Sequence, residues 1–337
     1  MQKQFELSGA MRFSVAPMVD VTDSVFRRMA RLFSKQSMLY TEMIAADAVI
    51  HGKNYLLEFH DEELPCVLQL GGSDPKKLAA AAKIGADFGY TEINLNAGCP
   101  SDKVQSGNFG AVLMKTPALI ADCVKAMQDA VSIPVTVKTR IGVDEDDSVA
   151  FTLKLIETIA ATGCPHVILH ARKAWLNGLS PKENRTIPPL DYERVYLVKK
   201  TFPNLKITIN GGITTIDAVK EQLQYVDGVM LGRAVIDNPF ILSKVDNEIF
   251  GSTKPLFSRE ELLYKAVDLS AKIKEEGIPV HHLMRHLLGL FNSCPGARLY
   301  RRYLSEHMTQ LGAGPDVLIK AYKSMTDARK QEGNYGN

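Results

Sequence analysis

The 337-residue sequence predicts an α/β protein, a (β/α)₈ TIM barrel followed by a small C-terminal all-α helical bundle. Short β-rich runs recur eight times in the first 235 residues, and helix-like stretches separate them. Nearly continuous apolar runs such as CVLQL and HVILH are typical of strands covered on both faces, as in a parallel sheet. Eight repeats of strand and helix are the sequence outline of such a barrel.

The eight predicted strands follow one another at intervals that leave room for a helix. They are residues 13–17, 38–42, 65–70, 90–94, 134–138, 166–170, 206–210 and 227–231. A doubly wound sheet would also show alternating strands and helices, but usually with fewer strands and often with a GxGxxG first turn. The glycine pairs at 71–72 and 211–212 lack that spacing, so a Rossmann dinucleotide site is not expected.

From about residue 258 no strand pattern alternates with the helical runs. Ser258 is a candidate N-cap for a helix over SREELLYKAVDLSAKIKEEG. Further helical runs are VHHLMRHLLGLFN, ARLYRRYLSEHM and PDVLIKAYKSMTDARKQ. With a linker at 246–256, the sequence predicts a catalytic barrel at 1–245 and a helical domain at 246–337.

Composition is that of an ordinary globular protein, with 45% hydrophobic and 23% charged residues. The five cysteines are scattered and form no CxxC pair, which indicates reduced thiols and no zinc site. No apolar run reaches the roughly 18–20 residues of a membrane span, and the N-terminus does not resemble a signal peptide. We therefore expect a cytoplasmic protein. The net charge of +2 permits nucleic-acid binding without requiring it.

Nearly every predicted strand ends on a polar or glycine residue, and barrel chemistry sits at those ends. Asn210-Gly211-Gly212 follows strand seven and Gly232-Arg233 follows strand eight. Loops at these positions often bind phosphate, because glycine lets the backbone approach closely and arginine supplies a fixed charge. The alternative is a tight turn and a surface cation. A phosphorylated ligand here would be a substrate or FMN.

Lys138 and His170 end strands five and six. A lysine in a barrel mouth needs an anion or an electron-rich ligand, so Lys138 fits either a flavin contact or an aldolase Schiff base, unless it extends to the rim. His170 is a candidate cofactor contact and a poor metal ligand. His282 and His286 lack the glutamate of HExxH, so helix packing explains them better.

Cys99 lies in NLNAGCPS, where a strand pattern stops at a glycine turn. Flanked by Gly98 and Pro100, it is either a buried space-filler or a reactive group in a shaped loop.

Several motifs together resemble the tRNA-dihydrouridine synthases. In order they are APMVDVTDSVFR (16–27), TEM (41–43), LQLGG (68–72), NLNAGCPSDKVQSGNFGAVLM (94–114), VKTRIG (137–142), HAR (170–172), NGG (210–212) and GR (232–233). The resemblance covers essentially the whole chain, and 94–114 is specific by itself. The length, YTEMIAADAVIHG and the 170–189 loop are most similar to the bacterial A subfamily, which modifies uridines 20 and 20a of the tRNA D-loop.

The resemblance implies an FMN enzyme that uses NADPH to reduce the C5=C6 bond of uridine, with hydride from reduced FMN to C6. It implies Cys99 as the proton donor to C5. The implied flavin contacts are Pro17, Met18, Val19, Gln69, Lys138, His170, Asn210, Gly211, Gly212, Gly232 and Arg233. The implied tRNA contacts are Lys182, Arg185, Arg298 and Arg301, and the expected protein is a monomer without a metal.

Residue chemistry agrees with that mechanism, because saturating C5=C6 requires a general acid at C5. An unperturbed thiol has a pKa of about 8.5, so it is mostly protonated at neutral pH. Asn94 and Asn96 would read the uracil edge. In the tail, Arg285, Arg298, Arg301 and Arg302 with Tyr300 and Tyr303 form a cation and aromatic cluster that suits RNA.

Three other functions stay open on the residues alone. A reductase of free pyrimidines would share the barrel and FMN but would leave the helical tail without a role. A lyase using Lys138 as a Schiff base would need no flavin. A non-catalytic RNA-binding protein would not need Cys99.

Overall fold

The computed structural model describes residue 9 and residues 11–52 and 56–334. The chain forms two compact units. The first comprises residues up to Thr22 and Ser37–Gly232, and the second comprises Asp23–Gln36 and the chain from Arg233 onward. The functional domains predicted at 1–245 and 246–337 stay a prediction. The boundary between the compact units in this part of the chain lies between Gly232 and Arg233.

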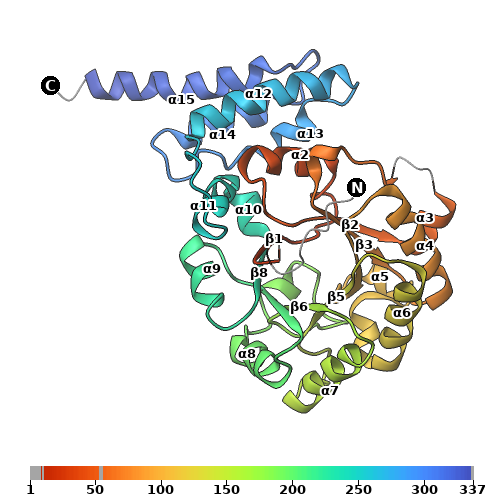
Figure 1. Ribbon diagram of the computed structural model, residues 1–337. Coiled ribbons are helices and arrows are strands. Elements are labelled where there is room, and N and C mark those ends of the chain that lie inside the picture. The colour runs from red at the N-terminus through yellow and green to blue at the C-terminus, as the bar shows by residue number, and fades with distance from the viewer. Residues whose placement is uncertain (1–8, 10, 53–55, 335–337) are drawn as a thin grey trace. The chain divides into compact units, whose positions relative to one another are not determined.

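Within the described residues, the first unit contains one sheet of eight parallel strands, ordered β1-β8-β7-β6-β5-β4-β3-β2 (Figure 1). The strands are β1 (Phe13–Val15), β2 (Leu39–Ala45), β3 (Cys66–Gly71), β4 (Glu92–Ala97), β5 (Val135–Arg140), β6 (His166–His170), β7 (Lys206–Asn210) and β8 (Gly228–Leu231). A parallel bridge between Ser14 and Met38 connects β1 to the residue before β2, so the sheet closes into a barrel. This confirms the predicted (β/α)₈ fold.

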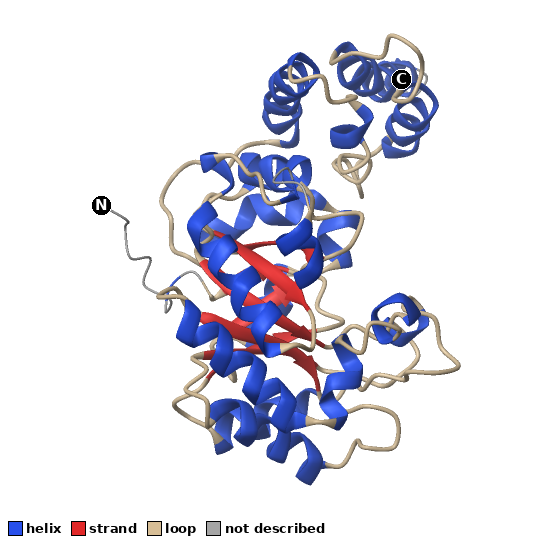
Figure 2. Cartoon of the chain, turned by 90° about the vertical axis from the view of Figure 1, so that its right-hand side faces the viewer, coloured by secondary structure: helices blue, strands red, loops and turns tan. Residues whose placement is uncertain are grey.

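Helices follow most of these strands and surround them, as Figure 2 shows for the red strands. They are α3 (Ala46–His51), α4 (Pro75–Phe88), α5 (Asp102–Gln105), α6 (Pro117–Ala130), α7 (Val149–Ala160), α8 (Tyr192–Thr201) and α9 (Ile216–Gln222). Among the described residues, the short 3₁₀ helices η2 (Asp61–Glu63), η3 (Gly110–Lys115) and η4 (Glu183–Arg185) lie between them. Local signals fix the ends of α4: Asp74 accepts from the Lys76 and Lys77 amides, Pro75 opens the helix, and Gly89 ends it with φ of +98°.

Alternate residues of each strand face the barrel interior. Part of this interior is an apolar cluster of Ala16, Met38, Tyr40, Val67, Ile168 and Met230, with Met18 packed against it. The remainder is polar. Glu92, Asn94, Thr136, His166 and Thr208 are all buried in the sheet. Burial raises the pKa of Glu92 to about 7, and burial lowers the pKa of His166 to about 4.

The second unit is helical and is built from two separate parts of the chain. Its helices are α2 (Ser24–Phe33), α10 (Arg233–Asp237), η5 (Pro239–Lys244), α11 (Val245–Glu248), α12 (Arg259–Glu275), α13 (His281–Met284), α14 (Ala297–His307) and α15 (Asp316–Asn334). α2, which follows the first barrel strand, packs against α12, α13 and η5. Arg28 of α2 forms a bidentate pair with Glu276 at 2.7 and 2.9 Å.

Two predictions about the tail can be compared with this unit. The Ser258 cap is confirmed, because its hydroxyl accepts from the Glu261 amide and the Glu261 carboxylate accepts from the Ser258 amide. The helix predicted over 280–292 is wrong in its length, since α13 spans only His281–Met284 and turns follow. At Gly289 a Cβ would lie 2.2 Å from the Asp237 carbonyl oxygen, so the two backbone segments pack too closely there for any side chain at position 289. None of the described helices is long and apolar enough to cross a membrane.

Candidate active site

The Cys99 segment is held by one side chain, that of Asn96. β4 ends at Ala97, three residues beyond its predicted end. Asn96 therefore lies within the strand, and Cys99 lies two residues after the strand ends. The Asn96 Oδ1 atom accepts hydrogen bonds from the Gly98 amide at 3.1 Å and the Cys99 amide at 3.0 Å. The half-buried Cys99 thiol lies 3.5 Å from the Ser101 hydroxyl. Cys99 is therefore in a fixed turn at the barrel mouth.

The segment that follows Cys99 folds back on it. The Ala111 amide donates to the Cys99 carbonyl oxygen at 2.8 Å. Gly110 has φ of +74°, and a Cβ there would lie 2.5 Å from the same carbonyl oxygen and from Val104 Cγ1. Only glycine combines this backbone conformation with this close approach. Gly110, the second glycine of GNFG, is thus needed to close the loop that carries the thiol.

Lys138 lies beside this segment, and its Nζ donates to Asn210 Oδ1 at 3.2 Å. The pKa of Lys138 is lowered to about 7, mainly by burial and in addition by the neighbouring Arg140 cation. A Cys99 thiolate acts in the opposite direction and would raise this pKa. Among the charged groups of the described residues that act on Lys138, none is a carboxylate. A buried amine in this setting favours an anionic or electron-rich ligand.

His170 and the glycine pair lie next to Asn210. His170 pairs with Asn210 in the sheet, and the Asn210 amide group donates to the Met230 carbonyl oxygen at 2.8 Å. Gly211 and Gly212 have φ of +113° and +75°. A Cβ on Gly211 would lie 3.2 Å from the His170 ring, and Gly212 is exposed. The sheet thus brings together Lys138, His170, Asn210 and an uncovered glycine backbone that suits a phosphate.

The two asparagines of NLN have their polar atoms bonded within the protein. Asn94 is 0% exposed; its amide donates to Thr136 Oγ1 and its Oδ1 accepts from Gln69, both at 2.8 Å. The prediction that Asn94 reads the uracil edge is therefore wrong, because the residue lies inside the barrel. Asn96 donates to Gln69 Oε1 at 2.9 Å and is nearly buried, so its predicted contact with the base stays a prediction.

The remaining predicted flavin contacts lie at the ends of β1 and β8. Met18 packs on the interior cluster, Pro17 is half-buried, and Val19 is 57% exposed. Gly232 follows β8, and a Cβ on it would lie 3.7 Å from Met18 Sδ. Arg233 is exposed and begins α10 in the second unit, so its phosphate contact stays a prediction.

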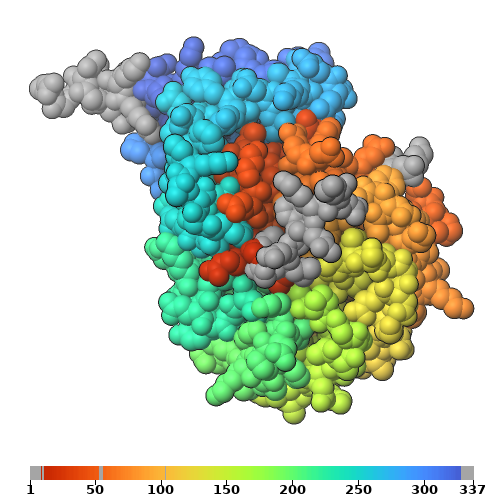
Figure 3. Space-filling view, viewed as in Figure 1, coloured from red at the N-terminus to blue at the C-terminus, as the bar shows by residue number. Residues whose placement is uncertain are grey.

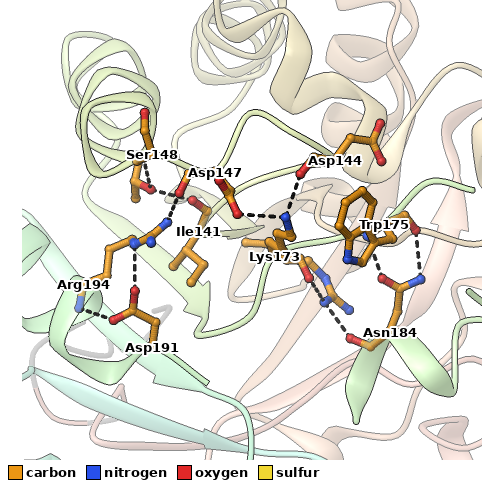
Figure 4. Close-up of polar contacts among 11 residues, drawn as sticks. Ile141, Asp144, Asp147, Ser148, Lys173, Trp175, Asn184, Asp191 and Arg194 are labelled. Carbon is orange, nitrogen blue, oxygen red and sulfur yellow. Dashed lines mark hydrogen bonds and ion pairs between the residues drawn. The ribbon is translucent and has the colours of Figure 1, made fainter. Parts of the chain in front are cut away.

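The loop after β6 carries Lys182 and Arg185, both exposed. Asn184, buried between them, organises this loop: its amide donates to the Trp175 carbonyl at 2.9 Å, and its Oδ1 accepts from the Trp175 amide at 2.7 Å (Figure 4). Lys173 donates to the Asp147 carboxylate at 2.8 Å and to the Asp144 carbonyl at 3.0 Å. Lys182 and Arg185 therefore lie on an ordered loop.

Two further residues connect this loop to the Cys99 segment, and sequence reasoning assigned no role to either. Arg140 donates to the Gly98 carbonyl at 2.9 Å and to the Lys173 and Asn184 carbonyls at 3.0 and 2.9 Å. The Gln105 amide donates to the Pro100 carbonyl at 2.8 Å and the Leu176 carbonyl at 2.7 Å. Both residues lie in the motifs 94–114 and 137–142, but long-range bonds to carbonyl groups leave no sequence signature.

In the second unit the predicted RNA-binding residues divide into two groups. Arg298 and Arg301 are exposed on α14, and Arg301 donates to Asn292 Oδ1 at 2.6 Å. Tyr300 is fully buried, with its ring 4.8 Å from that of Phe291, so its predicted place in an RNA-binding cluster is wrong. Arg285 pairs with Asp23 at 2.8 Å, and this carboxylate offsets its charge.

Comparison with known proteins decides the family. The family model described as Dihydrouridine synthase (Dus) matches residues 14–326. The chain belongs to the dihydrouridine synthase family. Proteins named tRNA-dihydrouridine(20/20a) synthase are similar to this dihydrouridine synthase over most of its length. The one from Shewanella oneidensis is 52% identical over 93% of each chain, and the one from Escherichia coli K12 is 52% identical over 98% of this chain and 96% of its own.

The match confirms the resemblance seen in the motifs, and dihydrouridine synthases are flavin-dependent. The Pasteurella multocida protein of the same name is 53% identical over 92% of this chain. The site described above lies in the barrel of this dihydrouridine synthase, with Cys99 just after β4 and Lys138 on the neighbouring strand β5.

Proposed function

We propose that the protein is a tRNA-dihydrouridine synthase that reduces the C5=C6 bond of uridines 20 and 20a in the tRNA D-loop. The observation that carries the proposal is the turn at Cys99, where Asn96 fixes a half-buried thiol beside the Lys138 and Arg140 cations. The names of the similar proteins support the reaction and the two positions. We further infer that it works in the cytoplasm as a monomer.

The residues of the mouth fit an FMN. Lys138, buried without a carboxylate among its charged neighbours, would donate to the ring, and His170 and Gln69 would line it. Asn210, Gly211 and Gly212 would hold the phosphate, with Gly232 and Arg233 beside them, and Pro17, Met18 and Val19 would cover the ring. When bound and reduced by NADPH, the flavin supplies the electrons that saturate C6.

Cys99 supplies the proton. As the C5=C6 bond is reduced, the S–H bond breaks and its proton goes to C5, leaving a thiolate. Arg140 and Lys138 are close enough for a Cys99 thiolate to raise the pKa of each. The thiolate that this step leaves then takes a proton from water, beside the Arg140 and Lys138 side chains.

The uridine must leave the tRNA stack to reach a barrel mouth. Lys182 and Arg185 would contact the RNA backbone from the loop after β6, and Arg298 and Arg301 would contact it from α14. Asn96, at the turn itself, would contact the base.

The deciding experiment maps dihydrouridine in tRNA from cells that lack this gene and from cells to which it has been restored. Dihydrouridine at positions 20 and 20a should disappear and return. Purified protein should carry FMN, consume NADPH and convert unmodified tRNA transcripts but not free uridine. A colourless protein, or one that reduces only the free base, would refute the proposal.

A further inference from the structure

A continuous chain of hydrogen bonds runs through the barrel interior from Glu92 to the Cys99 turn. Glu92, Asn94 and Asn96 are alternate residues of β4 and face the same side of the strand. Thr136 and Gln69 lie opposite Asn94 on the neighbouring strands β5 and β3. These five side chains are bonded in the order Glu92, Thr136, Asn94, Gln69, Asn96.

The chain can point in only one direction. The Gly98 and Cys99 backbone amides can only donate, so Asn96 must present its oxygen to them and its NH₂ group to Gln69. Gln69 then presents its oxygen to Asn96 and its NH₂ group to Asn94.

Asn94 in turn presents its NH₂ group to Thr136 at 2.8 Å. The Thr136 hydroxyl, accepting from Asn94, must donate its own proton to the Glu92 carboxylate. Every donor therefore points away from the Cys99 turn, and the chain ends on the buried acceptor Glu92.

We propose that Glu92, Thr136 and Asn94 are positioning residues, which hold Asn96 in the orientation that fixes the Cys99 turn. This inference rests on the proposed function for the role of Cys99. Each residue is buried, so none of them contacts substrate. An asparagine with its amide reversed would place NH₂ against two backbone N–H groups, and the turn would lose both bonds. The ordered chain opposes that reversal, because a reversed Asn96 would also place its oxygen against the Gln69 oxygen.

The chain offers a matched pair of variants. Thr136→Val removes the hydroxyl that connects Asn94 to Glu92. Thr208→Val makes the same change in the same interior, where the hydroxyl bonds the His166 Nε2 at 2.8 Å and not the chain. Thr136 and Thr208 are both 0% exposed. Thr136→Ser keeps the hydroxyl and should restore whatever Thr136→Val loses.

Two measurements on the full-length flavoprotein test the proposal. Hydrogen exchange of the Gly98 and Cys99 amides should become about fivefold faster in Thr136→Val, since one lost bond is worth about 1 kcal/mol, and should not change in Thr208→Val. Dihydrouridine formation at saturating tRNA from pre-reduced enzyme should fall by about fivefold in Thr136→Val alone, with flavin reduction by NADPH unchanged.

Equal behaviour of Thr136→Val and Thr208→Val in both measurements would overturn the proposal, as would failure of Thr136→Ser to restore the exchange rate. Should Thr136→Val not fold, Asn94→Ala interrupts the chain one bond nearer the turn, and the same comparison decides. The exchange measurement needs no substrate. If the wild-type protein formed no dihydrouridine, the proposed function would fail while the positioning chain would still be tested.

Discussion

At the residue scale, Cys99 combines a fixed position with cationic neighbours. Its backbone amide is bonded to Asn96, and Arg140 bonds the carbonyl of the preceding glycine. A thiol held in this way can give up a proton without the turn moving. These contacts distinguish Cys99 from Cys66, Cys123 and Cys164, which are buried in the barrel unit. For Cys123 and Cys164, burial also raises the thiol pKa to about 12.

Replacing Cys99 by alanine removes the proton donor and leaves the cofactor contacts in place. We expect Cys99→Ala to bind flavin and tRNA normally and to form dihydrouridine about 10²–10⁴-fold more slowly, the usual range for loss of a general acid. Single-turnover assays with pre-reduced enzyme measure this step. Cys294→Ala, which changes the other half-buried cysteine, should be fully active. Full activity of Cys99→Ala would refute the proton-donor role.

Glu92 predicts a pH dependence of stability. Burial raises its pKa from 4.5 to about 7, so between these values the folded protein binds more protons at Glu92 than the unfolded chain does. This contribution to the free energy of unfolding therefore falls as pH rises from about 4.5 to 7. Glu92→Gln removes it, so the variant should gain stability relative to wild type by about 3 kcal/mol over this range. Urea denaturation at pH 5 and pH 8 measures the difference.

His166 has the opposite effect on the pH dependence of stability. Burial lowers its pKa to about 4, so the unfolded chain binds more protons there between pH 4 and 6.5, and this contribution to stability rises with pH. The two groups partly cancel in the wild-type protein. Comparing Glu92→Gln with wild type at each pH removes the His166 effect from the difference. A difference that did not vary with pH would contradict the assignment.

At the element scale, the loop after β6 and the Cys99 segment are connected by Arg140, whose guanidinium group donates to three carbonyl oxygens. Arg140 is 4% exposed and lies at the end of β5. The loop that we propose to contact RNA and the proposed acid Cys99 are therefore positioned by one side chain on the barrel. Figure 3 shows the outer surface of this unit, with the segments from yellow to green packed side by side.

Lysine at position 140 would keep the charge but could not reach three carbonyl groups with one nitrogen. We expect Arg140→Lys to loosen the loop, to speed tryptic cleavage at Lys182 and Arg185, and to raise KM for tRNA by about tenfold, equivalent to roughly 1.4 kcal/mol. The matched control is Arg194→Lys, which alters a partly buried arginine of α8 that pairs with Asp191 at 2.9 Å (Figure 4). Equal cleavage of the two variants would contradict this role of Arg140.

Sequence patterns predicted the strands and their mouth residues well, because alternation and helix spacing are local properties. They did not predict which side chains face inward at the mouth. Asn94 and Asn96 differ by two positions and so share a face, but Asn94 lies deeper in the barrel, with 0% exposed, whereas Asn96, with 8% exposed, reaches the turn. The burial of Tyr300 escaped prediction for a similar reason, since helical spacing next to three arginines does not show which face is covered.

At the scale of the whole molecule, the basic face of α14 is the part of the helical unit that we expect to contact tRNA. Arg298→Glu with Arg301→Glu should weaken tRNA binding and lower the slope of log K against log salt by about 2, roughly one per lost phosphate contact. NADPH oxidation by the flavin should not change. Binding titrations at several salt concentrations measure this, with Lys323→Glu on α15 as a control of the same sign. An unchanged tRNA affinity would exclude α14 from the interface.

The chain passes between the two units three times, after Thr22, after Gln36 and after Gly232. Helix α2 packs against α12, α13 and η5, with the Phe26 ring 5.1 Å from that of His286, yet it is encoded between the first two strands of the barrel. The helical tail is consequently not a portable module. An exchange of tails between related enzymes at one junction near residue 233 would leave each α2 against a foreign partner. Chimaeras that transplant residues 23–36 together with the tail should fold where single-junction chimaeras do not.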